Sequence, residues 1–130
     1  MAKGFREQVC YCGVRLIDGE FITLEMELGM SELEANSTSW RGTDQGTQIK
    51  SSPEDSPAWD GTNTSGFSGL GGGSRLYSGQ TNFNGSNGYF WSASGYGANA
   101  WNRILSEGFA GVTRSSSGQR SGFSVRCVRD

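Results

Sequence analysis

The spacing of hydrophobic and polar residues changes along the chain, and its first clear period is helical. Phe21, Leu24 and Leu28 recur at i, i+3 and i+7, which predicts a helix over about residues 19–28. Asp18 stands where the N-cap is expected. The same segment also alternates as a strand would, but its Glu, Leu and Met residues and its few β-branched residues favour a helix.

A second, short helix is predicted directly afterwards. Ser31 and Glu34 form the Ser-x-x-Glu pattern of a capping box. From Trp40 to Leu76 no period persists, and an irregular segment of this length is typically functional or held down by its own side chains. The expected anchors of this segment are Trp40, Trp59, Phe67 and Leu70.

The last third of the chain predicts strands. Asn84-Gly85 and Asn87-Gly88 are tight-turn dipeptides. Three apolar segments follow, at residues 89–92, 100–105 and 122–128. Together they predict an antiparallel sheet with one buried face.

Alternation assigns the faces of these strands. On the middle strand, Trp101, Arg103 and Leu105 share one face, and Asn102 and Ile104 share the other. On the last strand, Phe123, Val125 and Cys127 are expected to point inward, with Ser124 and Arg126 on the opposite side.

Length and composition indicate one α+β domain spanning residues 1–130, whose first 12 residues form an N-terminal extension or a first strand. Charged residues make up only 18% of the chain, and 21 residues are Gly. No apolar run reaches the roughly 20 residues that cross a bilayer. The first residues contain no apolar stretch, so no secretory signal peptide and no membrane insertion are expected.

The net charge of −2 conceals an uneven distribution. Residues 1–60 carry 11 acidic and 5 basic side chains, whereas residues 61–130 carry 2 and 6. Scattered arginines are a poor nucleic-acid footprint. We therefore expect arginines to pair with the acidic first half across one fold, and no nucleic-acid partner.

Several catalytic and metal chemistries are disfavoured by the residues present. The chain has no His, which removes the usual general base and a common metal ligand. The glycines of residues 69–75 lack the Lys of a phosphate-binding loop, and the acids between Asp44 and Asp60 match no calcium-loop spacing. The serines at 115–117 are expected in a solvated loop. No catalytic residue, cofactor or metal is predicted.

Three cysteines leave two alternatives open. Cys127 can tie the two chain ends together through a disulfide to Cys10 or Cys12, or all three thiols stay reduced. An odd count leaves at least one free thiol in either case.

Tyr, Trp, Asn, Ser and Gly are concentrated between Tyr77 and Asn102. Binding loops of antibodies use this mixture of rigid aromatic and small polar side chains. For Tyr96, Asn99, Asn102 and the loop at residues 82–87, the composition fits a binding surface and ordinary turns equally well.

Several motifs resemble those of the Fibrobacter succinogenes major paralogous domain family. They are Trp40-Arg41-Gly42-Thr43-Asp44-Gln45-Gly46, Gly66-Phe67-Ser68, Gly73-Ser74-Arg75, Gly88-Tyr89-Phe90-Trp91-Ser92 and Gly122-Phe123-Ser124-Val125-Arg126-Cys127-Val128. The resemblance runs from about Gly13 to the end of the chain. It implies a C-type-lectin-like fold with two short helices, a small twisted antiparallel sheet and long Gly-, Ser- and Asn-rich loops.

The resemblance also implies a function. Members of this group serve as variable proteins of diversity-generating retroelements, in which a C-terminal stretch is mutated on a fixed scaffold, and residues 92–106 are similar to such a stretch. We therefore expect a non-enzymatic module that binds a protein or glycan ligand at a bacterial, secreted or virion surface. The predicted binding residues are Ser94, Tyr96, Asn99, Asn102, Ile104 and Ser106, flanked by Asn82, Asn84 and Ser86. The predicted scaffold residues are Trp91, Trp101, Arg103, Phe123 and Val125.

Two other functions remain as alternatives. A cysteine-dependent oxidase similar to formylglycine-generating enzymes requires an accessible Cys127 near Cys10 or Cys12. A structural domain of a surface or phage-tail assembly requires no variable site. Calcium-dependent sugar binding is not expected, because Trp101-Asn102 is followed by Arg103, which would repel the cation.

Overall fold

The computed structural model describes residues 5–6, 14–76 and 78–128. The helices are α1 (Asp18–Glu27), α2 (Glu32–Ala35) and α3 (Gln45–Ile49). The strands are β1 (Phe5–Arg6), β2 (Val14–Arg15), β3 (Ser39–Arg41), β4 (Ser74–Arg75), β5 (Thr81–Asn82), β6 (Asn87–Tyr96), β7 (Asn99–Ser106), β8 (Val112–Gly118), β9 (Ser124–Val125) and β10 (Cys127–Val128). None of the described helices has the length and apolar character needed to cross a membrane.

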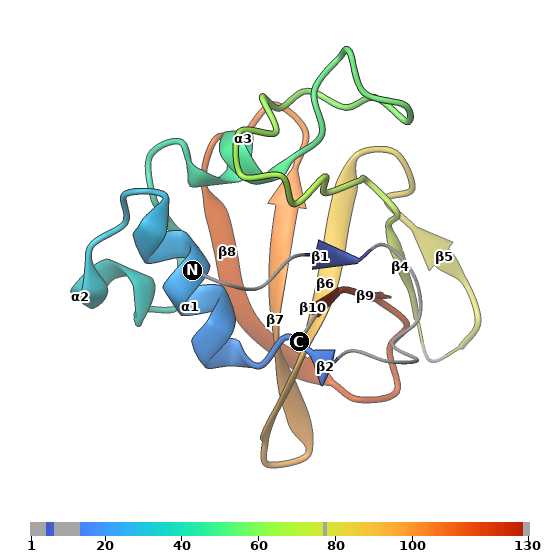
Figure 1. Ribbon diagram of the computed structural model, residues 1–130. Helices are drawn as coiled ribbons and strands as arrows, with labels where there is room; N and C mark the ends of the chain where they lie inside the picture. Colours follow the sequence, from blue (N-terminus) through green and yellow to red (C-terminus); the bar gives the residue numbers. More distant parts are fainter. Residues whose placement is uncertain (1–4, 7–13, 77, 129–130) are drawn as a thin grey trace.

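A five-stranded sheet forms the centre of the molecule, in the order β3-β8-β7-β6-β9. Its first four strands are antiparallel, and β9 adds to β6 in parallel. The smaller sheets are β1-β10-β2 and β4-β5. Figure 1 shows α1 and α2 on the same side of the large sheet. The prediction of an α+β fold is confirmed at this level, but the sheet is mixed rather than wholly antiparallel, because β9 returns alongside β6.

Both predicted helices exist, and their first turns refine the prediction. Helix α1 begins at Asp18, so its N-cap is Ile17, and the N–H of Ile17 donates to the Glu20 carboxylate at 3.0 Å. The expected N-cap, Asp18, instead sends its carboxylate into the protein interior, as described below. The predicted cap of α2 is confirmed, since Ser31 Oγ accepts a hydrogen bond from the N–H of Glu34 at 3.2 Å.

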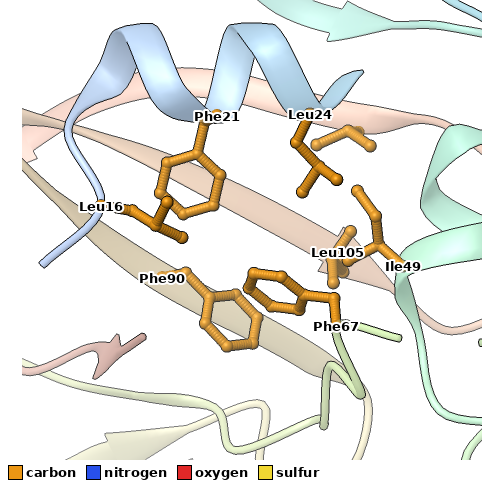
Figure 2. Close-up of a cluster of buried hydrophobic side chains, with 8 residues drawn as sticks. Leu16, Phe21, Leu24, Ile49, Phe67, Phe90 and Leu105 are labelled. Carbon is orange, nitrogen blue, oxygen red and sulfur yellow. The ribbon is translucent and has the colours of Figure 1, made fainter. Parts of the chain in front are cut away.

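The hydrophobic core lies between α1 and one face of the large sheet. Its buried members are Leu16, Phe21, Leu24, Ile49, Phe67, Phe90, Leu105 and Val112. Figure 2 shows Phe21 and Leu24 pointing from α1 toward the strands, with Phe67 entering from the long loop. Phe67 meets Phe90 edge to face at 5.5 Å, so it anchors the loop as predicted. Trp40, expected as another anchor, is 46% exposed, so that prediction is wrong.

Strand β8 is the largest departure from the sequence prediction. The serines at 115–117, expected in a solvated loop, belong to this strand, which lies between β3 and β7. Helix α3 was also not predicted, and its five residues are too few to show a period. Pairing on both sides satisfies the backbone of β8, so small polar side chains are tolerated where the tertiary structure supplies neighbours.

The last predicted strand is divided between two sheets. Residues 124–125 form β9 of the large sheet, and residues 127–128 form β10 of the β1-β10-β2 sheet, with Arg126 between them. The expected inward and outward sides are reversed here, because Val125 is 40% exposed and Arg126 is only 7% exposed. Arg126 is buried because its Nη1 donates to the carbonyl of Phe67 at 2.6 Å and its guanidinium lies over the Phe67 ring. Cys10, Cys12 and the Cys127 side chain lie outside the described residues and side chains.

Candidate functional site

The face of the large sheet that packs on α1, here called the inner face, contains a buried ionic network. Arg103 donates its Nε to Glu25 at 2.6 Å and its Nη1 to Asp18 at 2.7 Å. Arg114 binds the other oxygen of Asp18 at 2.7 Å, and Arg41 binds Glu25 at 2.6 Å. Arginines from both halves therefore pair with carboxylates of α1, as the uneven charge distribution predicted.

The electrostatics of this network are those of a structural element. Burial alone would raise the pKa of Asp18, but hydrogen bonds and charges from Arg114 and Arg103 outweigh it and hold that pKa below its ordinary value. Burial also lowers the pKa of Arg41. Each of the four carboxylate oxygens of Asp18 and Glu25 accepts at least one hydrogen bond from an arginine. We assign this network to stability rather than to proton transfer.

The opposite side of the sheet, here called the outer face, has a different composition. The strand registers place side chains of all five strands there: Trp40, Tyr89, Trp91, Ala100, Asn102, Ile104, Thr113, Ser115, Ser117, Phe123 and Val125. None of these side chains is charged. Aromatic and small polar groups lie side by side, which is a composition typical of binding surfaces.

Aromatic pairs mark the two edges of the outer face. At one edge, the ring of Phe123 lies 4.3 Å from that of Trp91 and 5.0 Å from that of Tyr89. At the other edge, Trp40 meets Phe109 edge to face at 5.3 Å. Trp40 and Phe109 are 46% and 57% exposed, so this pair is available to a partner.

The hairpin between β6 and β7 carries two of the predicted binding residues. Tyr96 and Asn99 face each other across the turn, and Gly97 has the positive φ of 63° that a type II′ turn requires at its first central position. Tyr96 is 59% exposed, and its ring lies 4.9 Å from that of Trp101. Figure 1 shows this hairpin projecting beyond the body of the molecule.

Asn102 departs most from its predicted exposure. It is 0% exposed, so the expectation of a solvent-facing side chain is wrong for this residue. Its Nδ2 donates to Ser117 Oγ at 2.9 Å, and its Oδ1 has no partner among the described residues. It occupies the outer face, as alternation predicted, but larger neighbours such as its cross-strand partner Trp91 surround it.

The other predicted binding residues occupy three places. Ile104 and Ser106 are half-buried on β7, and Ser94 is half-buried and accepts a hydrogen bond from the N–H of Asp18 at 2.9 Å. Asn82 is half-buried at the end of β5, whereas Asn84 and Ser86 are exposed in the turn before β6. Phe83 brings this turn next to the outer face, because its ring lies 6.2 Å from that of Tyr89.

Sequence reasoning did not find several outer-face residues. Trp91 and Val125 were expected to be buried scaffold, and Trp40 and Phe109 were not proposed as site residues. Only strand pairing puts Trp40, Trp91 and Val125 on one surface, and Phe109 joins it through its contact with Trp40. Alternation within a strand predicts which of its own residues lie on the same face. It does not predict which residues of another strand lie on that face.

A hollow of about 270 Å³ lies at one end of the outer face. Its lining residues are Trp91, Ser92, Ala93, Ser94, Gly95, Ala100, Gln119 and Val125. None of them carries a charge. Five of the eight belong to residues 92–106, the stretch that resembles a variable region.

Two of the acids that could have held a cation, Asp55 and Asp60, have other partners. Asp55 accepts hydrogen bonds from the Ser52 N–H and the Asn63 amide, which hold its pKa below the ordinary value. Asp60 pairs with Lys50 at 2.8 Å. Within residues 5–6, 14–76 and 78–128, no cluster of three His, Cys, Asp or Glu side chains is placed to bind a metal.

The sequence model of one family, the Fibrobacter succinogenes major domain, matches residues 7–129. The chain belongs to this family. No curated protein and no solved structure matches the chain. Membership of the Fibrobacter succinogenes major domain family therefore confirms the resemblance seen in the motifs and leaves the function to be argued from the site.

Proposed function

We propose that this member of the Fibrobacter succinogenes major domain family is a non-enzymatic binding module that presents its outer sheet face to a ligand on a cell surface. The scaffold that the family resemblance implies is C-type-lectin-like. The observation that carries the proposal is the contrast in side chains across one sheet, because charges are buried against α1 while uncharged aromatic groups remain half-exposed on the other side.

The chemistry of the described residues supports binding over catalysis. The buried carboxylates are occupied by arginines, and the outer face offers rings, hydroxyls and amides rather than an activated nucleophile. A partly exposed, uncharged surface that combines aromatic rings with small polar groups is typical of an interaction site. Five of the described basic side chains are buried, which also disfavours a nucleic-acid ligand: Arg41, Lys50, Arg103, Arg114 and Arg126.

Diversification by a retroelement is a finer part of the same proposal. Residues 92–106 include the hairpin and β7, and along β7 outer-face positions alternate with inner-face positions. Ala100 and Ile104 lie on the outer face, whereas Arg103 and Leu105 are buried on the inner face. Substitutions at the outward positions would change the ligand surface while leaving the core intact, which is the property that a variable scaffold needs.

The test uses a phage-displayed peptide library panned against the immobilised full chain. Thr113→Arg places a long cation in the outer face, between Trp40 and Ile104. Leu33→Arg is the matched control, because Leu33 is 87% exposed on α2, on the opposite side of the sheet.

We expect enriched peptides to lose about tenfold or more in affinity for Thr113→Arg and to keep their affinity for Leu33→Arg, with similar melting temperatures for both variants. Peptides that bind both variants equally, or a library from which no binder emerges, would overturn the proposal.

A further inference from the structure

The hollow at the end of the outer face is produced by an irregularity in β6. Trp91 pairs with Asn102, but the next paired residue of β6 is Gly95, opposite Ala100, so β6 has more residues than β7 across this interval. A bulge of this kind bends the strand and opens the surface. The residues within it are small, and Ala100 opposite is small too, so little side-chain volume fills the space.

Two sides of the hollow are apolar, and one of them is held in place by its neighbours. The Trp91 ring forms one wall, held by its stacking on Phe123 at 4.3 Å and by a hydrogen bond from Nε1 to the carbonyl of Ser121 at 3.3 Å. Val125, 40% exposed, forms another wall. Because the indole N–H is already used, the ring presents apolar surface to whatever enters.

The polar side chains at the hollow are uncharged, and they are those of Ser92, Ser94 and Gln119. Gln119 donates its Nε2 to the carbonyl of Asn99 at 2.9 Å, which leaves its Oε1 as an acceptor. Ser92 and Ser94 use their Oγ atoms as acceptors for the N–H groups of Ser94 and Asp18. The site therefore combines apolar walls with one amide oxygen, Gln119 Oε1, and with two serine hydroxyls.

We propose that this hollow is an anchor pocket for one tyrosine side chain of a protein partner, an inference that rests on the function proposed above. A tyrosine ring is apolar along its body and polar at its tip, which matches Trp91 and Val125 on the walls and the acceptor of Gln119 at the rim. The phenol O–H donates to Gln119 Oε1. A charged side chain would lose its hydration here without gaining a counter-ion.

The dimensions favour a protein over a free small molecule. The hollow, at about 270 Å³, is smaller than the roughly 300–1,000 Å³ typical of drug-sized ligands, so it suits a single side chain. The sheet around it is much larger. Four strand spacings of about 4.8 Å and the length of β7 give an outer face on the order of 500 Å², a large part of the roughly 800 Å² that one partner buries in a standard interface.

The direct test is a titration of the isotope-labelled full chain, followed by the amide and indole NMR signals. The probes are N-acetyl-L-tyrosinamide, the phenylalanine analogue that lacks the hydroxyl, the glutamate analogue that carries a charge, and methyl α-glucopyranoside. We expect the tyrosine probe to shift the Trp91 indole, Gly95 and Ala100 signals with a dissociation constant of about 1 mM. The phenylalanine probe should bind more weakly, and the other two should not bind.

Two variants fill the hollow without touching the core, and one matched variant does not. Ala100→Leu and Ala93→Leu each add a side chain inside the hollow, whereas Ala98→Leu adds the same group at the exposed hairpin tip. We expect the first two to weaken the tyrosine probe about fivefold or more and the third to leave it unchanged. Using both Ala100 and Ala93 keeps the test valid if one variant folds poorly.

The outcomes separate this inference from the proposed function. Library peptides that are blocked by Thr113→Arg but unaffected by Ala100→Leu and Ala93→Leu would overturn the pocket and leave the binding face standing. A glucoside that shifts the same signals more strongly than the tyrosine probe would also overturn it, in favour of a glycan. Peptides insensitive to all three variants would overturn the binding face itself.

Discussion

The inner and outer faces of the large sheet are built from the same strands but differ in the burial and the charge of their side chains. On β7, Arg103 and Leu105 point inward and are 2% and 1% exposed, while Ile104 between them points outward and is half-buried. The inner face buries charges and satisfies them with partners. The described side chains of the outer face carry no charge and leave aromatic rings partly uncovered, which is typical of a surface that a partner covers.

The difference teaches which side of the sheet specifies the fold and which is free for recognition. Arg103 bonds to both Asp18 and Glu25, so α1 can dock on the sheet in only one way without leaving a buried charge unpaired. No comparable constraint acts on Ile104 or Thr113. Stability should therefore depend strongly on the inner face and binding on the outer face.

The largest expected effect comes from breaking the ionic network. Glu25 is 0% exposed and accepts hydrogen bonds from Arg41 and Arg103. Glu25→Gln keeps the shape but leaves Arg41 without its counter-ion and Arg103 with Asp18 alone, so we expect a loss of about 3–5 kcal/mol in the free energy of unfolding, measured with urea. Glu32→Gln, at an exposed position on α2, is the control and should change stability by less than about 0.5 kcal/mol. Equal losses in the two variants would refute the role of the network.

A matched pair of neighbours on β7 compares the two faces directly. Leu105→Ala removes a side chain that is 1% exposed in the core, and we expect it to cost about 2–5 kcal/mol in the free energy of unfolding. Ile104→Ala removes a half-buried side chain from the outer face and should cost about 1 kcal/mol, because solvent already reaches this side chain. Thermal and urea unfolding of both variants measure these losses. A larger loss of unfolding free energy for Ile104→Ala than for Leu105→Ala would reverse the assignment of the faces.

The smallest effect is a dependence of stability on acid. The folded-state pKa of Asp18 lies below its ordinary value of 3.8, because the arginines outweigh the effect of burial. The stabilisation is therefore complete above that value and is lost as the pH falls through the lower, folded-state pKa. We expect the urea concentration at the unfolding midpoint, measured between about pH 6 and pH 2, to decrease once the pH drops below 3.8.

We expect Asp18→Asn to lose less stability to urea than the unchanged protein does as the pH falls. Asp60, whose burial is outweighed by its bonds to Lys50 and the Gly108 N–H, also has a lowered pKa and contributes to the remaining slope. Glu54→Gln, which alters an exposed carboxylate, serves as the control. An unchanged slope in Asp18→Asn would mean that the arginines do not hold this carboxylate ionised.

Local patterns predicted the parts of the fold whose cause lies within a few residues. The helical period of Phe21 and Leu24 predicted α1, the serine at position 31 predicted the start of α2, and alternation predicted the two faces of β7. Strand β8 was not predicted, because its serines have a low strand preference. Its hydrogen-bond partners come from β3 and β7, and β3 is distant in sequence.

The candidate site was predicted less completely than the fold. Tyr96 and Asn84 are exposed as expected, and Asn102 is not, because burial depends on which neighbours another strand supplies. Trp40 and Val125 show the reverse error, since each is an apolar residue expected inside and found on the surface.

The amino-acid sequence by itself determined the family, the helix α1, the alternating faces of β7 and the need for arginines to find carboxylates, because each depends on residue type and short-range spacing. Only the tertiary structure decided that Arg126 goes inside, that Val125 goes outside, and that Trp91, Val125 and Ala100 meet around one hollow. Strand register and the bulge in β6 set those positions, and both arise from pairing between segments far apart in the chain.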